Sequence, residues 1–394
     1  MLKKLIITLG IIVIIGAGVF QGAKSWIKGM LPDKVYFQQL KRTQATDLPY
    51  VTENIPTYKG KILAVVTSTN LMGNNKATGY EHTELARAYW VFIANGFDVD
   101  IASPLGGKPP VVFDGEDMGK YDYAFINDKE AQEKINNSIA LADINPLDYQ
   151  AVYFVGGKGT MFDFPDNRDI QRIAKTLYQT GRVVSAVCHG PAALVNVELD
   201  NGEMLLANKK VSGFTNKEEL VLIPEAQEIF PFLLEDKLVE RGANFQAGLS
   251  YLEQVSQDGK LITGQNPWSV WKMAELVVEE LGYQPKPRTK TPEENSVELL
   301  ITYEKNGFEA AKAQLKRQHG PHQQVLLLMH SAIAFMQLDF TKGWDIINLA
   351  QELKNLGISK FWKINIFSIF FQKISKFWKI SIFSIFVQKI TKIE

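Results

Sequence analysis

The chain has 394 residues, of which 46% are hydrophobic and 22% charged, and its 43 basic residues balance its 43 acidic ones. This composition excludes wholesale disorder and predicts about two domains. Neutrality argues against a nucleic-acid partner, because nucleic-acid binders normally carry a basic footprint. The single cysteine, Cys188, excludes an intrachain disulfide and a zinc site built on several cysteines.

The N-terminal end has the pattern of an export signal or a membrane anchor. Residues 5–20 carry no charge, and lysines flank them on both sides. The run is short for a span, which needs about 20 apolar residues, and a cleaved signal peptide fits as well. We expect residues 1–28 to anchor the protein in a membrane through an N-terminal helix, with the rest extracytoplasmic (periplasmic). Residues 29–59 are expected to form a linker.

Between residues 60 and 286 the sequence alternates apolar strands with helices. Strands are predicted at 61–67, 98–102, 150–155, 183–187, 210–214 and 259–264, and helices at 81–95, 167–180 and 268–281. This alternation is typical of an α/β fold, a flavodoxin-like three-layer sandwich with a mainly parallel sheet. Ligands of such folds bind beyond the carboxyl ends of the strands.

The only cysteine directly follows one of these strands, in the order Val187-Cys188-His189-Gly190-Pro191. A strand, a nucleophile and a helix in this order predict the sharp turn that exposes the nucleophile of hydrolases. A helix N-terminus beside the sulfur would favour the thiolate, and backbone N–H groups of the turn can hold an oxyanion. A buried structural cysteine is the alternative, but it needs neither the adjacent histidine nor the Gly-Pro helix start.

Six ordered motifs between residues 60 and 283 resemble the DJ-1/PfpI superfamily, with its class I glutamine amidotransferase-like fold. The most specific motif is Ala186–Ala192 around the cysteine, and the other five lie at 78–85, 96–107, 153–159, 211–219 and 261–267. The last two resemble the glyoxalase III/heat-shock chaperone subgroup. Members of this superfamily include proteases, chaperones and glyoxalase-like enzymes, so the family alone does not fix the activity.

The resemblance assigns roles to six residues. It implies that Cys188 is the nucleophile, that His189 lies beside it, and that Glu84 approaches the sulfur as a protonated carboxyl. Glu219 falls where the subgroup places the acid that orients the histidine, and Glu218 is one residue off. With His189, Gly157 and Lys158 would offer backbone N–H groups to an oxyanion. Lys158 departs from relatives that often carry histidine there.

These roles favour a cofactor-independent, glyoxalase-type (D-lactate dehydratase-like) enzyme that acts on methylglyoxal or a related α-oxoaldehyde. Cys188 would form a hemithioacetal, and Glu84 would move a proton between adjacent carbons on the way to a 2-hydroxy acid. A holding chaperone, a cysteine peptidase and an amidotransferase-like hydrolase remain alternatives. We expect a small carbonyl substrate, no cofactor, no metal site and a homodimer as one assembly. His82 is expected to be a surface residue rather than a metal ligand.

The C-terminal hundred residues differ from the middle. A stretch rich in proline and lysine, residues 284–292, predicts a boundary. Residues 293–356 have helical patterns with a 32-residue offset, so we expect a tetratricopeptide-like helical extension or a simple helical one. Residues 358–373 recur almost unchanged at 374–389. We expect residues 357–394 to form a tandem-repeat tail rich in aromatic residues and lysine, as an interfacial helix on a membrane surface or a helical tail, although a strand pattern fits the repeats almost as well.

Overall fold

The structure is a computed structural model that describes residues 34–73, 75–114, 118–318 and 320–356. Two segments with predictions of their own, the anchor at 1–28 and the repeat tail at 357–394, lie outside these residues. The described chain divides into two compact units. Residues 40–297 form the sheet unit, and residues 298–356 together with 34–39 form the helical unit.

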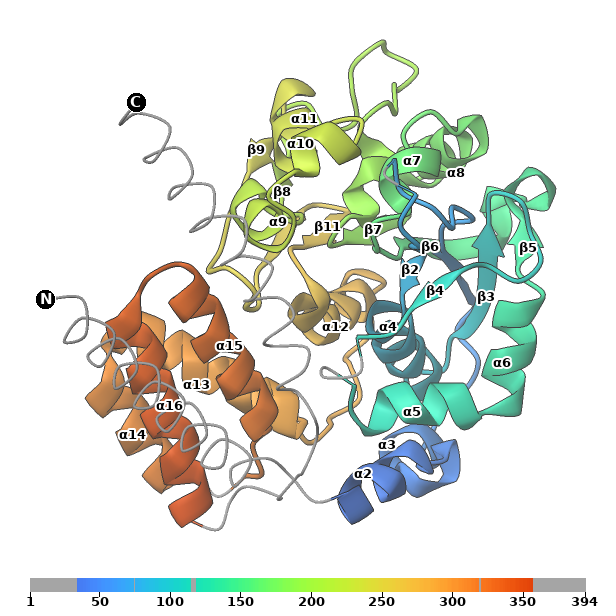
Figure 1. The fold of residues 1–394 in the computed structure, drawn as a ribbon. Helices are drawn as coiled ribbons and strands as arrows, with labels where there is room; N and C mark the ends of the chain where they lie inside the picture. Colours follow the sequence, from blue (N-terminus) through green and yellow to red (C-terminus); the bar gives the residue numbers. More distant parts are fainter. Residues whose placement is uncertain (1–33, 74, 115–117, 319, 357–394) are drawn as a thin grey trace, which may run out of the picture. The chain divides into compact units, whose positions relative to one another are not determined.

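The core of the sheet unit is a sheet of seven strands in the order β10-β11-β7-β6-β1-β3-β5 (Figure 1). Every neighbouring pair is parallel except β10 and β11, which run antiparallel. The predicted mainly parallel α/β sheet is therefore confirmed. The strands of this sheet are β1 Lys61–Val65, β3 Asp98–Ser103, β5 Ile139–Ala140, β6 Tyr149–Phe154, β7 Val183–Val187, β10 Val255–Asp258 and β11 Leu261–Gly264.

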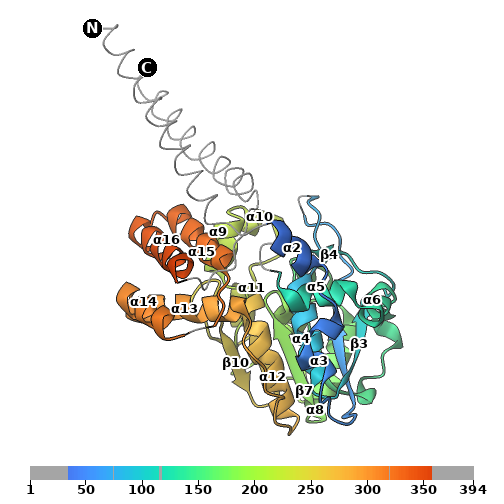
Figure 2. The same cartoon turned by 90° about the horizontal axis from the view of Figure 1, so that it is seen from below.

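Helices cover both faces of this sheet, which explains why its central strands are apolar without alternation. Helices α4 and α12 pack on each other and against β1 and β7, whereas α8 packs on β6 and β7 from the other side (Figure 2). The helices of the sheet unit are α3 Pro49–Thr52, α4 His82–Ala94, α5 Lys120–Asn127, α6 Lys129–Asn136, α7 Thr160–Asp163, α8 Arg168–Gln179, α9 Asn216–Leu222, α10 Ala226–Ile229, α11 Leu234–Glu240 and α12 Val270–Glu280. Helix α2, Lys34–Lys41, spans the boundary between the two units.

One predicted strand does not join the main sheet. Of residues 210–214 only β8, Lys210–Val211, is extended, and it pairs with β9, Asn244–Phe245, in a separate ribbon. The chain then leaves the strand at Ser212, whose N–H donates to the side chain of Thr263 at 2.8 Å. This early exit carries α9 across the carboxyl edge of the sheet. A second ribbon pairs β2, Tyr80–Glu81, with β4, Val111–Val112.

Two residues of the proline- and lysine-rich stretch, Lys286 and Arg288, tie it to the sheet unit, although several of its other residues are exposed. The backbone N–H of Lys286 donates to the side chain of Asn95 at 2.7 Å. Arg288 donates to Glu275 at 2.8 Å and to both oxygens of Glu294, and its guanidinium lies over the ring of Trp271. Residues 286–294, here called the strap, are therefore part of the sheet unit.

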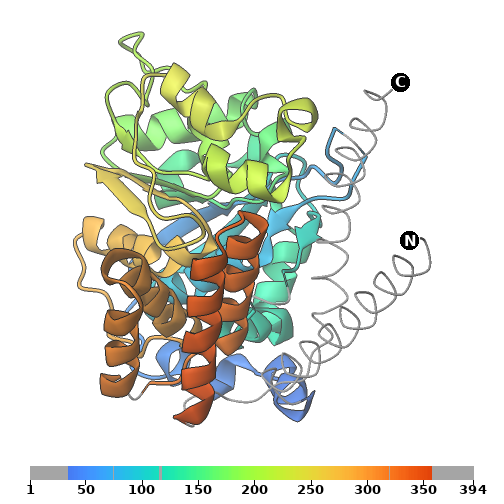
Figure 3. The same ribbon diagram turned by 60° about the vertical axis from the view of Figure 1, so that its left-hand side comes forward.

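The helical unit supports the predicted helical extension in its coarse form. It contains most of α13, Pro292–Asn306, followed by α14 Phe308–Arg317, α15 Gln324–Met336 and α16 Phe340–Asn355. Helices α15 and α16 lie side by side, drawn in red in Figure 3. At their contact, the hydroxyl of Ser331 donates to the carbonyl of Gly343 at 2.8 Å. The tetratricopeptide character of this unit stays a prediction.

None of the helices in the described ranges has the length and apolar character needed to cross a membrane. The helix predicted for residues 1–28 is outside those ranges, so the structure does not describe it.

Candidate active site

Cys188 occupies a strained turn at the carboxyl end of β7. Its φ is +59°, a left-handed value that is unfavourable for a residue with a Cβ atom. Two backbone hydrogen bonds hold this conformation: the N–H of Cys188 donates to Gly264 at 2.9 Å, and its carbonyl accepts from Phe214 at 2.9 Å. Two residues on, position 190 must be glycine, because a Cβ on Gly190 would lie 2.3 Å from the carbonyl oxygen of Phe154. This is the geometry of a nucleophile elbow.

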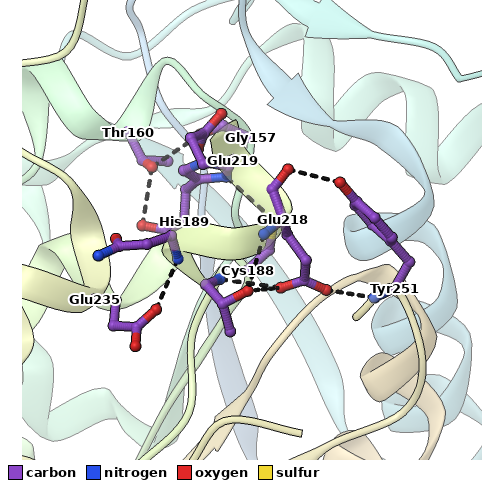
Figure 4. Close-up of polar contacts among 10 residues, drawn as sticks. Gly157, Thr160, Cys188, His189, Glu218, Glu219, Glu235 and Tyr251 are labelled. Carbon is purple, nitrogen blue, oxygen red and sulfur yellow. Dashed lines mark hydrogen bonds and ion pairs between the residues drawn. The ribbon is translucent and has the colours of Figure 1, made fainter. Parts of the chain in front are cut away.

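His189 and Glu219 continue from the sulfur as a chain of polar contacts (Figure 4). The Nδ1 atom of His189 lies 3.2 Å from the sulfur of Cys188, and its Nε2 lies 2.5 Å from Oε2 of Glu219. Both side chains are buried, and Phe214 stacks on the imidazole with 4.6 Å between ring centres. Burial raises the pKa of Glu219, but the positive charge and hydrogen bond of His189 outweigh it and leave that pKa lowered. The structure thus brings together Cys188, His189 and Glu219.

Glu84 reaches the same sulfur from the first turn of α4. Its side chain is fully buried, and Oε2 accepts the backbone N–H of Gly156 at 2.8 Å. Oε1 has no hydrogen-bond partner among the described residues. Burial raises the pKa of Glu84 to about 8, against the opposing hydrogen bonds of Cys188 and Gly156. The carboxyl is therefore protonated over most of the neutral range.

The thiol is not activated in the way the sequence suggests. Burial raises the pKa of Cys188 well above its ordinary value, and the charge and hydrogen bond of Glu84 add to this effect. The segment after the elbow, Gly190–Leu194, is a five-residue 3₁₀ helix, too short to supply the expected macrodipole. The short 3₁₀ segment gives no support to a helix-stabilised thiolate, and the raised pKa of Cys188 favours the protonated thiol.

Glu218 and Glu219 are neighbours in sequence with different surroundings. Glu218 is fully buried and points away from the histidine. One of its oxygens accepts the N–H and the hydroxyl of Thr215 at 3.0 and 2.9 Å. The other accepts from Tyr251, Gln265 and Asn266 at 2.6, 3.0 and 3.1 Å. Glu218 therefore ties α9 to the two segments that follow it, and this anchoring role was not expected from the sequence.

The glycine turn after β6 closes the site opposite α9. A Cβ on Gly156 would lie 2.5 Å from Oε2 of Glu84 and 2.8 Å from the Cβ of Cys188. The hydroxyl of Thr160 donates to the carbonyl of Gly157 at 2.8 Å and also lies 3.1 Å from the carbonyl of His189. Among the described residues, the backbone N–H groups of Gly157, Lys158 and His189 have no acceptor. They are available to an oxyanion.

Thr160 and Phe214 are site residues that the sequence reasoning missed. Phe214 belongs to one of the motifs and Thr160 directly follows another, but only the fold shows that Thr160 bridges two turns and that Phe214 stacks on the imidazole. His82, expected on the surface, is buried, and its Nε2 lies 2.9 Å from the carbonyl of Asp122. No group of three or more metal-ligating side chains occurs in the part of the chain that the structure describes.

A parallel α/β sheet with a cysteine elbow, a histidine beside the sulfur and a carboxyl on each side defines a class of cysteine-centred α/β proteins. The family model described as DJ-1/PfpI family matches residues 76–280 of this chain. The chain therefore belongs to the DJ-1/PfpI family.

Relatives place the chain in the glyoxalase III/heat-shock chaperone subgroup. Glyoxalase 3 of Candida albicans is 32% identical over 236 residues, which cover 55% of this chain and 97% of that protein. Glutathione-independent glyoxalase HSP31 of Saccharomyces cerevisiae is 31% identical and covers 56% of this chain and 98% of itself. Two solved structures are similar. Rapid Encystment Protein 24 KDa of Francisella tularensis is 37% identical with a TM-score of 0.54, and the match covers 57% of this chain and 99% of that one. Glyoxalase III of Candida albicans is 29% identical with a TM-score of 0.51, and the match covers 57% of this chain and 98% of that one.

The predicted location is wrong. A membrane-anchored, periplasmic enzyme was expected, but the described residues contain no helix that could span a membrane. The curated relatives match over nearly their whole length and consist of little more than the matched region. Membrane anchoring therefore has no support from the described residues or from the relatives. The expected homodimer stays a prediction.

Proposed function

We propose that the chain is a glutathione-independent glyoxalase that converts methylglyoxal or a related α-oxoaldehyde into a 2-hydroxy acid. The names of its curated relatives support an enzyme of this kind. The observation that carries the proposal is the pairing of one sulfur with two differently charged carboxyls. Glu84 has a raised pKa and Glu219 a lowered one, so the site can hold a mobile proton on one side and an orienting negative charge on the other.

In the first step, the sulfur of Cys188 forms a bond to the aldehyde carbon. The thiol proton passes through Nδ1 of His189, 3.2 Å from the sulfur, to the aldehyde oxygen. Glu219 stabilises the imidazolium that forms in between. The product of this step is a hemithioacetal.

In the second step, Glu84 in its ionised form takes the proton from the carbon that carries the sulfur. With a pKa near 8, this form is a minor but accessible fraction at neutral pH, and its conjugate acid is well matched to return the proton. The electron pair forms a carbon–carbon double bond, and the ketone oxygen becomes an oxyanion facing the N–H groups of Gly157, Lys158 and His189. Glu84 then gives the proton to the second carbon while the hydroxyl on the first carbon passes its proton to the oxyanion, which leaves a thioester with a hydroxyl on the second carbon. Water cleaves the thioester and releases the 2-hydroxy acid and the thiol.

The test is lactate formation from methylglyoxal by the purified protein in the absence of glutathione. Activity that is lost in Cys188→Ala and in Glu84→Gln, with both variants folded, supports the proposal. Lys272 is exposed on α12, so Lys272→Met is a matched surface control that should keep the activity. A folded wild-type protein that produces no lactate contradicts the glyoxalase proposal, and assays for peptidase and holding-chaperone activity should follow.

A further inference from the structure

The glycine turn between β6 and α7 contains one ionisable side chain, that of Lys158. In Gly156-Gly157-Lys158-Gly159 the neighbours of Lys158 have no side chains. The turn is clamped on both flanks: Gly156 touches Glu84 and the elbow, and a Cβ on Gly159 would lie 2.7 Å from the side chain of Thr67. The backbone at Lys158 is therefore fixed beside the elbow.

The ammonium of Lys158 is not used by the hydrogen bonds or ion pairs of the described residues. The lysine is partly buried, yet its Nζ makes no hydrogen bond or ion pair with any other described residue. Its electrostatic partners are Glu219, Asp114, Cys188 and Glu81. Burial alone would favour the neutral amine, but the interactions with the carboxylates, Glu219 first and then Asp114, outweigh it and raise the pKa of Lys158, so the side chain is a cation at neutral pH.

A second cation acts on the same site but is not available to a ligand. Arg87 also interacts with Glu84 and is buried on α4. Its guanidinium pairs with Asp122 at 3.3 Å, donates to the carbonyl of Pro267 at 3.2 Å and lies over the ring of Trp268. Of these two cations that act on Glu84, only Lys158 has no hydrogen-bond or ion-pair partner among the described residues.

We propose that the ammonium of Lys158 is a catalytic group that contacts the substrate oxygens and stabilises the negative charge that develops on them. The proposed reaction creates that charge when Glu84 takes the proton from the carbon bearing sulfur. The electron pair of that bond forms the carbon–carbon double bond, and the ketone electrons move to oxygen. Under this proposal the ammonium lies near this oxygen, and it lowers the barrier because a partly buried charge is already in place before the negative charge forms. This role is additional to the backbone N–H of the same residue.

The inference rests on the proposed function for the identity of the substrate, but the charge can be tested without it. Cys188 is the only cysteine, so alkylation by anionic iodoacetate and by neutral iodoacetamide reports on one sulfur. The ratio of the two rates reports how well the site accepts a negative group, since any change in thiolate fraction affects both rates equally. The ratio should fall at least fivefold in Lys158→Met at low ionic strength and be kept in Lys158→Arg. Lys272→Met is the control that should leave it unchanged.

The second measurement is steady-state turnover of methylglyoxal by the same full-length variants. We expect kcat to fall roughly 10- to 100-fold in Lys158→Met with KM changed less than about threefold, as for loss of a single transition-state donor. An alkylation ratio within twofold of wild type in folded Lys158→Met, or in Lys158→Gln if the former does not fold, overturns the inference. So does an unchanged kcat. A ratio that falls in a protein whose wild type makes no lactate overturns the glyoxalase proposal and leaves Lys158 as the anion-stabilising group of a different reaction.

Discussion

Nε2 of His189 lies 2.5 Å from Oε2 of Glu219, and both side chains are buried beside the sulfur of Cys188. This contact fixes the imidazole so that its other nitrogen faces the sulfur. Because the contact joins residues 189 and 219 across the carboxyl edge of the sheet, its precision depends on where α9 is anchored. We therefore expect residues that act on the substrate to affect turnover, and residues that anchor α9 to affect stability.

Glu219 and Glu218 give a matched pair of variants. Glu219→Gln should lower kcat by roughly 10- to 100-fold with little loss of stability, because the imidazole loses the carboxylate that stabilises its charged form. Glu218→Ala should lower the free energy of unfolding by about 2–4 kcal/mol, because it leaves several buried donors without an acceptor. Denaturant unfolding together with lactate assays checks both. Equal effects of the two variants on stability would contradict this division of roles.

Glu84 should make stability depend on pH. Its pKa is 4.5 in the unfolded chain and about 8 in the folded protein, so between these values the folded state binds more protons than the unfolded state. The free energy of unfolding contributed by this group therefore falls as the pH rises through that window, by up to about 1.4 kcal/mol per pH unit. Urea unfolding at pH 5, 6.5 and 8 should show a steeper decline for the wild type than for Glu84→Gln. Parallel curves for the two proteins would show that the carboxyl is not desolvated in the folded state.

Gly156 should tolerate no side chain. In Gly156→Ala the new Cβ would meet Oε2 of Glu84 and the Cβ of Cys188, so we expect at least a 100-fold loss of kcat/KM. Gly202→Ala is the control: its φ is +82° but nothing lies within 4 Å of the added Cβ. That change should cost about 1 kcal/mol of stability and leave kcat unchanged. An active Gly156→Ala enzyme would mean that Glu84 does not need its present distance from the sulfur.

Arg288 should hold the strap on the sheet unit. Its side chain is 6% exposed and lies between Glu275 and Glu294. Arg288→Met removes the positive charge and leaves these carboxylates uncompensated, which should cost about 3–5 kcal/mol in free energy of unfolding. Arg288→Lys should recover part of this loss, since a lysine keeps the charge but not the two-pronged contact. Thermal unfolding measures the loss, and a change in melting temperature of less than 2 °C, well below the shift of several degrees such a loss implies, would contradict it.

The sequence by itself determined the sheet, the elbow and the family. Short apolar runs such as Val183–Val187 predict strands buried on both faces of a parallel sheet, because only such strands need a continuous apolar sequence. The Cys-His-Gly-Pro order after that strand likewise predicts a tight turn from local sterics alone. The segment at 210–214 failed as a strand because its pairing partner is 244–245, which no local pattern indicates.

Only the tertiary structure decided which groups share the site and what charge they carry. Glu218 and Glu219 are adjacent in one helix and point about 100° apart, so a single turn of α9 determines which one meets His189. The same holds for the pKa values: the opposite shifts of Glu84 and Glu219 come from burial and from a partner thirty residues away, not from their local sequence. Local sequence sets backbone conformation, whereas desolvation and Coulomb interactions depend on distances that exist only once the chain has folded.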